Sequence, residues 1–224
     1  MKISRYFVLP ALLMGTAMAQ NPAAGLWTGE VTLNRVSEVH FRQTTGTTPT
    51  ETTAPFAMRV LLHVDGSGGV KLLKEAILMQ TPGSVPVRVI VTQPNLISNF
   101  VGIVERNGKL TGRRFSTAGF PMAGDRLALS GSLNGGGSAS GSMTLAADHP
   151  VNPFRHKYHP DLSTAGVAVT RAITLTVNAG DTAEDHRLTG TWLESMTGLH
   201  KDAIQVSGGM TLVRVSTVAA LNNQ

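Results

Sequence analysis

The chain has 224 residues, of which 42% are hydrophobic and 15% charged, and its formal net charge is +5. This length fits one large β domain or at most two small ones, and the absence of cysteine excludes disulfide scaffolds, thiolate metal sites and cysteine nucleophiles. Beyond the N-terminal segment, no stretch approaches the roughly 20 apolar residues of a membrane-spanning helix, so we expect no transmembrane span.

The first nineteen residues have the three-part layout of a secretory signal peptide. Lys2 and Arg5 form a positive start, an apolar stretch follows, and Ala17 and Ala19 place small residues at the −3 and −1 positions of a cleavage site. We therefore predict that residues 1–19 are a cleaved signal peptide and that the protein is secreted or periplasmic. Loss of Lys2 and Arg5 lowers the formal net charge from +5 to +3. This small excess suits an anionic envelope polymer as a partner and is too small to indicate nucleic-acid binding.

Near the start of the mature chain, the pattern predicts a hairpin. Segments 56–64 and 70–79 flank a glycine-rich turn at 65–69. The second segment also contains residues that favour a helix, but a short turn and a regular strand precede it, so we expect a strand. A threonine-rich stretch at 44–53 is expected to be a loop.

Further along the chain, glycine turns separate more segments with a period of two. The pair Asn107-Gly108, between 100–104 and 110–116, is the strongest short hairpin signal in the chain. In the late segment 167–177, Ile173, Leu175 and Val177 alternate with threonines, which indicates one dry and one wet face. The expected fold is all-β, an antiparallel barrel or sandwich of roughly ten strands, with residues 20–224 as a single domain. Its remaining strands are expected at 126–133, 138–146, 188–195 and 209–216.

The segment 148–163 interrupts this rhythm and contains most of the candidate chemistry. His156 and His159 are three residues apart, and Asp161 follows two residues later. Neutral imidazole and carboxylate are the ligands that zinc and other divalent first-row ions prefer. One hypothesis is therefore a metal site formed by His156, His159, Asp161 and the distant His200, with His149 or Asp202 as further ligands.

Other features of this segment favour different interpretations. Its prolines stiffen an extended loop, and the positive charges of Arg155 and Lys157 would repel a cation. One alternative is a structured loop that packs Phe154 and Tyr158 onto the barrel. Another is a ligand-binding or anion-binding loop that uses Arg155, His156, Tyr158 and His159.

Four runs of residues resemble a poorly characterised group of exported bacterial proteins. Asn-Pro-Phe-Arg-His-Lys-Tyr-His-Pro-Asp at 152–161 and Gly-Leu-His-Lys at 198–201 are the most specific, and the runs at 26–31 and 210–215 are similar too. The resemblance implies export and a shared fold but no activity. The group would have histidine where this chain has Leu162, which weakens any metal site that needs that ligand.

The two tryptophans also suggest a resemblance, to lipocalin-like barrels. Gly25-Leu26-Trp27 and Gly190-Thr191-Trp192 match the G-x-W pattern, whose tryptophan closes one end of such a barrel. The pattern fixes only two residues, and a tryptophan that fills the core at the start of a strand would produce it as well.

Other motifs indicate structure rather than catalysis. Arg113 and Arg114 fit an exposed strand edge, where charge prevents pairing with other chains, better than a polyanion site. Ser138 and Ser140 lie in a hairpin tip and lack the G-x-S-x-G frame of a nucleophilic serine, so no catalytic residue is assigned.

Two functions follow from these patterns. We expect a secreted, β-barrel-like module that binds an unknown ligand or has a structural role in the envelope. We expect such a module rather than an enzyme. The alternative is a metal-dependent hydrolase that uses a His/Asp site in the 149–161 loop, with a metal-bound water as nucleophile. No cofactor is expected, except a divalent metal under the second hypothesis.

Overall fold

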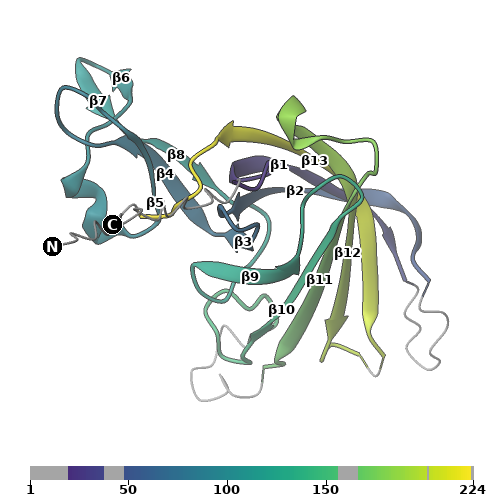
Figure 1. The fold of residues 1–224 in the computed structure, drawn as a ribbon. Coiled ribbons are helices and arrows are strands. Elements are labelled where there is room, and N and C mark those ends of the chain that lie inside the picture. Colours follow the sequence, from purple (N-terminus) through teal and green to yellow (C-terminus); the bar gives the residue numbers. More distant parts are fainter. Residues whose placement is uncertain (1–19, 38–47, 156–165, 201, 223–224) are drawn as a thin grey trace, which may run out of the picture.

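The structure is a computed structural model that describes residues 20–37, 48–155, 166–200 and 202–222 (Figure 1). No helix within these ranges is long and apolar enough to cross a membrane. They form thirteen strands and two short 3₁₀ helices: β1 (Gly25–Val36), β2 (Thr50–Val64), β3 (Val70–Leu73), β4 (Glu75–Gln80), β5 (Arg88–Val91), η1 (Pro94–Asn99), β6 (Val104–Arg106), β7 (Lys109–Thr111), β8 (Arg113–Ser116), β9 (Arg126–Gly131), β10 (Ser138–Leu145), β11 (Val169–Val177), η3 (Ala183–Asp185), β12 (Arg187–Thr197) and β13 (Ile204–Ser216).

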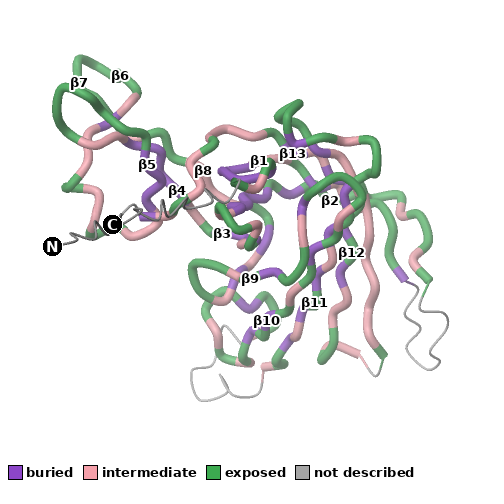
Figure 2. The backbone as a smooth tube through the Cα atoms, in the orientation of Figure 1, coloured by how far each residue is buried: buried purple, intermediate pink, exposed green. Residues whose placement is uncertain are grey.

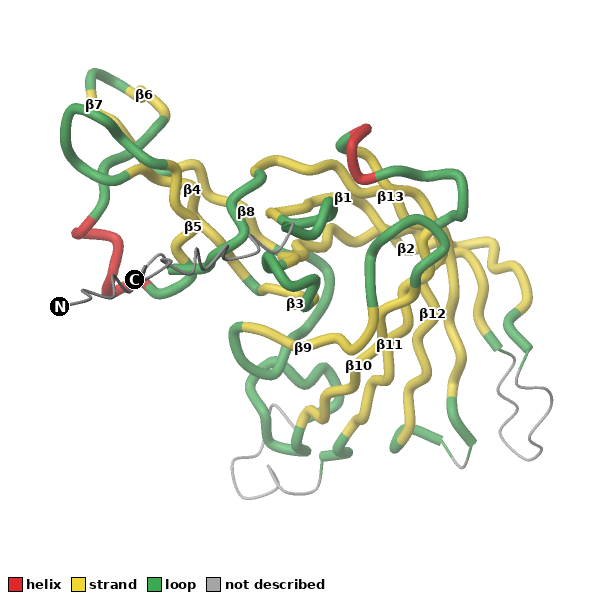
Figure 3. Tube along the Cα trace, viewed as in Figure 1, coloured by secondary structure: helices red, strands yellow, loops and turns green. Residues whose placement is uncertain are grey.

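Eight strands form a closed antiparallel barrel (Figure 3). Around the ring the order is β1, β2, β3, β9, β10, β11, β12 and β13, and β13 pairs with β1 to close it. Apart from the closing pair of β1 and β13, strands that are adjacent in the ring are also consecutive in the chain, except that β4 to β8 are inserted between β3 and β9. The predicted all-β antiparallel fold is thus confirmed, and of the two architectures considered it is the barrel.

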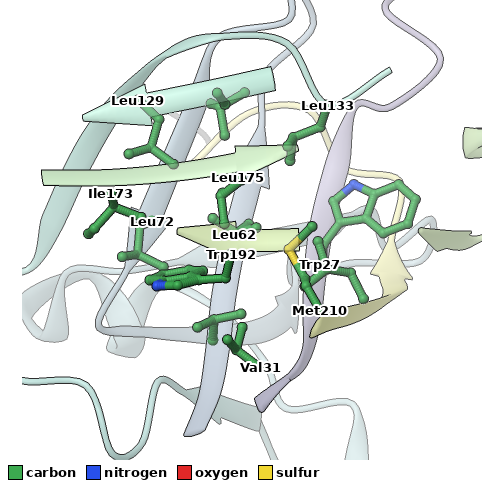
Figure 4. Packing of buried hydrophobic residues seen from close by; sticks show 14 of the residues in the cluster. Trp27, Val31, Leu62, Leu72, Leu129, Leu133, Ile173, Leu175, Trp192 and Met210 are labelled. Carbon is green, nitrogen blue, oxygen red and sulfur yellow. The ribbon is translucent and has the colours of Figure 1, made fainter. Parts of the chain in front are cut away.

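The core of the barrel follows from the alternation of its strands. In β11 every second residue from Val169 to Val177 is buried, which confirms the predicted dry face of this segment. Figure 2 shows buried residues along the barrel strands, and Figure 4 shows how their side chains meet inside the ring. The largest apolar cluster includes Trp27, Val31, Val60, Leu62, Leu72, Leu129, Leu133, Ile173, Leu175, Leu188, Trp192, Met210 and Leu212.

One end of the barrel is sealed around Trp27, near the start of β1. The indole Nε1 of Trp27 donates a hydrogen bond to the Ala23 carbonyl at 2.8 Å. The guanidinium of Arg214, on β13, lies 5.1 Å from the Trp27 ring centroid, and its Nη2 donates to the Ala183 carbonyl at 2.7 Å. The second G-x-W motif differs, since Trp192 lies in the middle of β12 and not at the start of a strand.

The inserted segment forms a three-stranded sheet, in the order β5, β4, β8, and a separate hairpin of β6 and β7. In Figure 1 both extend outward on one side of the barrel. The sheet packs against the outer face of the barrel through a second apolar cluster, whose buried members are Leu26, Leu61, Leu73, Ala76, Leu78 and Ile90.

The segment 70–79 is extended, as predicted, but it is not one strand. It divides at Lys74 into β3, which pairs with β2 in the barrel, and β4, which pairs with β5 and β8 in the inserted sheet. The Lys74 N–H donates to the Asp125 carbonyl at 2.8 Å, so the two ends of the insertion are joined where they leave the barrel.

Two other predictions need adjustment. The Asn107-Gly108 turn is confirmed, with positive φ angles of 52° and 74°, but its arms are only the short strands β6 and β7. The threonine-rich stretch 44–53 is not entirely a loop, because Thr50 to Thr53 belong to β2, and Thr50 and Glu51 pair with the end of β1.

Candidate ligand-binding site in the barrel interior

The end of the barrel opposite Trp27 is its mouth, bounded by Val36, Leu145 and Thr197, where β1, β10 and β12 end. A segment of the insertion, residues 117–125, turns into the barrel at this end. The Ala118 N–H and carbonyl form hydrogen bonds with the backbone of Arg59 at 2.8 and 2.9 Å. Beyond this anchor, Phe120 and Met122 are buried and belong to the apolar cluster inside the barrel.

An ion pair lies within this apolar interior. Arg171 on β11 occupies the same face as Ile173 and Leu175, and Glu194 on β12 occupies the same face as Trp192. The Arg171 Nη2 donates to Glu194 Oε2 at 2.9 Å, and the Arg171 Nε donates to the other carboxylate oxygen. The Glu194 side chain has no exposed surface. The pair is therefore bidentate and enclosed by protein.

Two aromatic rings complete the arrangement. The Arg171 guanidinium lies 4.0 Å from the centroid of the Phe120 ring, and its Nη1 reaches the Pro121 carbonyl at 3.3 Å. Phe120 in turn meets Trp192 edge to face, with ring centroids 5.7 Å apart. We call Phe120, Arg171, Trp192 and Glu194 the mouth cluster.

The mouth cluster contains one polar group without a partner. Trp192 is fully buried, and its indole Nε1 has no hydrogen-bond partner among the described residues. Figure 4 shows this nitrogen at the end of the ring that points away from Trp27. A buried N–H without a partner lowers the stability of the fold by roughly 1–3 kcal/mol. The indole of Trp27 avoids this penalty, because it donates to the Ala23 carbonyl.

The residue types of the mouth cluster are those of a ligand-binding site as well as those of a protein core. A buried ion pair adds little to stability, since well-packed apolar residues of similar volume do as well or better. Ligand pockets, by contrast, are mainly apolar and aromatic with a few convergent polar groups. The mouth cluster has this composition: two aromatic rings, a neutralised ion pair and one free donor.

The connection between β10 and β11, which includes the predicted loop, lies at the same mouth. Asn152 is buried there, and its Nδ2 donates to the carbonyls of Ala146 and Val167 at 2.9 and 2.7 Å. It thereby joins the two ends of the connection. The expectation that Phe154 packs onto the barrel is wrong, because its side chain is 49% exposed. Arg155 is half-buried in this turn.

The other residues predicted for this loop, His156, Tyr158, His159 and Asp161, lie outside the described residues. His200 is described, in the connection from β12 to β13 at the mouth, and its Nδ1 accepts the Asp202 N–H at 3.4 Å. Within the described part of the chain, no three His, Cys, Asp or Glu side chains gather as a metal site would need. The metal and ligand-binding roles assigned to these residues stay predictions.

A separate pocket of about 290 Å³ lies on the inserted sheet. Its floor includes Ile77, Val91 and Ile97, and at its edge Arg114 donates to Glu75 at 3.0 Å. The Arg114 side chain is 61% exposed and that of Glu75 39% exposed. Of the residues that the sequence analysis singled out, Arg114 lines this pocket, whereas the residues predicted as metal or ligand contacts do not.

No protein-family model matches the chain, and no curated protein matches it in sequence.

The sequence contained a signal for part of the mouth cluster. Arg171 lies in phase with Ile173, Leu175 and Val177, and a charge on the dry face of a strand indicates a buried polar group with a partner. Glu194 is the partner, one strand later.

Proposed function

We propose that this protein is an exported binding module that holds a small aromatic molecule in the mouth half of its barrel. Export is supported by the three-part N-terminal layout. Binding is supported chiefly by the unpartnered Trp192 N–H, which lies in an apolar interior beside a buried ion pair.

The mouth cluster favours a particular ligand chemistry. Arg171 presents the face of its guanidinium to an aromatic ring, which Phe120 supplies in this structure. The free Trp192 donor calls for an oxygen or nitrogen acceptor. Because Glu194 already neutralises Arg171, a carboxylate ligand would meet a like charge, so the preferred acceptor is a neutral carbonyl or hydroxyl oxygen.

The ligand enters by displacing Phe120. This side chain comes from a connecting segment and not from a barrel strand, so its removal breaks no hydrogen bond of the barrel. The ligand ring then takes the place of the Phe120 ring over Arg171, and its acceptor atom meets the Trp192 N–H.

The test uses the indole N–H signals of the ¹⁵N-labelled protein, of which there are two because the chain has two tryptophans. Trp27→Phe and Trp192→Phe variants assign them. We expect acetophenone to shift the Trp192 signal downfield and to leave that of Trp27 unchanged, since Trp27 already donates to Ala23. Ethylbenzene, which has no acceptor, and benzoate, which is charged, serve as matched controls and should have at least tenfold weaker effects.

A Phe120→Ala variant strengthens the test, because it removes the ring that the ligand must displace. It should bind acetophenone more tightly than the wild type does, whereas Leu212→Ala, which opens space elsewhere in the barrel, should not. Equal shifts of both indole signals, or no binding by either the wild type or Phe120→Ala, would contradict the proposal.

A further inference from the structure

The end of the inserted sheet farthest from the barrel carries two projecting tips. Beyond Gln80, which pairs with Arg88 on one side and with Val101 on the other, the chain forms a turn at 81–87 and later the hairpin at 104–111. We call these two segments the distal tips. Figures 1 and 2 show them together at the outer end of the insertion, with most of their residues exposed.

The distal tips expose aliphatic side chains to solvent. Val85 is 82% exposed and Leu110 is 56% exposed, and Val87 and Val104 are exposed as well. Scattered exposed apolar residues need no explanation, but four of them on two adjacent projections mark a contact surface.

These side chains are presented by ordered backbone. The Thr81 N–H donates to the Val87 carbonyl at 2.9 Å, and the Val87 N–H donates to Thr81 Oγ1 at 2.9 Å, so the base of the first tip is closed. In the second tip, Asn107 and Gly108 form the tight turn between β6 and β7. The exposed aliphatic groups are thus held in place before any contact forms.

The positive charge of the protein is concentrated in the same region. Between residues 75 and 116, the inserted segment has two acidic residues, Glu75 and Glu105, against five basic ones, so its formal net charge is +3. Residues 20–224 together also have +3, so the rest of that range is neutral. The five basic residues, all of them exposed, are Arg88, Arg106, Lys109, Arg113 and Arg114, of which Arg114 is paired with Glu75.

We propose that the distal tips are a docking surface for a bilayer of anionic phospholipid, which the protein touches peripherally. Basic side chains attract such a surface, and each one near it increases partitioning roughly fivefold. The aliphatic groups of Val85 and Leu110 then enter the boundary between head groups and acyl chains, where the apolar area that they bury strengthens binding.

The observations favour lipid over two other occupants. A hydrated anionic polymer would use the basic residues but would gain little from exposed valine and leucine side chains. A second copy of the chain, docked through the same tips, would bring two segments of net charge +3 together. This inference is independent of the proposed ligand site inside the barrel.

The test measures co-sedimentation of the chain that begins at Gln20, which contains every described residue, with lipid vesicles. We expect binding to vesicles of 30% phosphatidylglycerol in phosphatidylcholine, little binding to phosphatidylcholine alone, and loss of binding as salt increases. Val85→Asp and Leu110→Asp should each reduce partitioning at least tenfold. The double variant Arg106→Glu/Lys109→Glu should reduce it further.

Leu193→Asp is the matched control, because Leu193 is an exposed leucine on the barrel strand β12 and its substitution should leave partitioning within twofold. Thermal unfolding of each variant verifies that it is folded. Absence of binding to the anionic vesicles would overturn the proposal. So would binding that depends on the basic residues but not on Val85 and Leu110, which would indicate an anionic polymer site, or a dimer in sedimentation equilibrium that Val85→Asp dissociates.

Discussion

Arg171 and Glu194 occupy positions where the neighbouring inward side chains are apolar, so their charges depend on each other for compensation. Each is surrounded by groups that cannot replace its partner: Phe120 offers Arg171 only a ring face, and the nearest carbonyl, that of Pro121, is 3.3 Å from Nη1. Replacing one partner should therefore lower the free energy of unfolding much more than replacing both.

We predict that Glu194→Leu lowers the free energy of unfolding by about 3–5 kcal/mol, whereas the double variant Arg171→Met/Glu194→Leu stays within about 1–2 kcal/mol of the wild type. Urea unfolding at pH 7 measures both. Glu30→Leu, on the outer face of β1, controls for loss of a carboxylate and should change little. If Glu194→Leu cost no more than Glu30→Leu, the pair would not be the buried unit described above.

Among individual residues, some features of the candidate site were predictable and others were not. The charge of Arg171 on a dry face could be found by its phase with Ile173 and Leu175. The role of Phe120 could not, because segment 117–125 has no periodicity that would reveal which of its side chains turns inward. Its burial depends on tertiary contacts alone.

Among the structural elements, the sealed end of the barrel depends on the last strand. β13 places the guanidinium of Arg214 over the Trp27 ring of β1. The same guanidinium donates to the carbonyl of Ala183, just before β12, and its Nε donates to His186 Nδ1 at 2.9 Å. One planar side chain thus links the start of β1, the connection before β12 and the end of β13. Lysine cannot reproduce this, because its ammonium group is neither planar nor forked.

Arg214→Lys should therefore lower the free energy of unfolding by about 2 kcal/mol, because several hydrogen bonds that Arg214 donates are lost. Thermal unfolding measures this loss of stability. In a Trp192→Phe background, a red shift of Trp27 fluorescence would show that the sealed end is the part that loosens. Arg59→Lys is a suitable control, since that exposed side chain lies on β2. An unchanged melting temperature for Arg214→Lys would contradict this account of the sealed end.

The division of 70–79 at Lys74 shows what sequence patterns cannot supply at this scale. Every residue from Val70 to Met79 is compatible with a strand, so the extended conformation was predictable. Which strand each half pairs with was not, because β2 and β5 offer similar apolar faces. The Asn107-Gly108 turn could be located because positive φ angles restrict the residue types.

At the scale of the whole molecule, a buried histidine lies between the barrel and the segment that follows β13. His63 on β2 has its Nε2 3.2 Å from the Val218 carbonyl, while Nδ1 has no partner among the described residues. Burial lowers the pKa of His63 from 6.5 to about 4, with a smaller contribution in the same direction from Lys71, against the opposing effects of the Val218 carbonyl and Asp65. The neutral form is therefore the one that fits this interface.

Because the pKa of His63 is lower in the folded state, the unfolded state binds the proton more tightly. The contribution of His63 to the free energy of unfolding should be fully present above pH 6.5 and fall by up to about 3 kcal/mol as the pH decreases to 4. Below pH 4, His63 should cause no further loss of stability. Urea unfolding of the wild type and of His63→Gln across this range isolates the effect. His63→Gln should lack this component, and identical pH profiles would refute the assignment.

The ring closes by pairing β1 with β13, the first strand with the last. During synthesis, a nascent chain can assemble β1 to β3 only as an open ribbon. The free edge of β1 stays unpaired until β13 has been made near the end of the chain. Contacts this distant in sequence make folding slow. The long exposure of the β1 edge predicts that this chain needs a holding chaperone more than its modest size suggests.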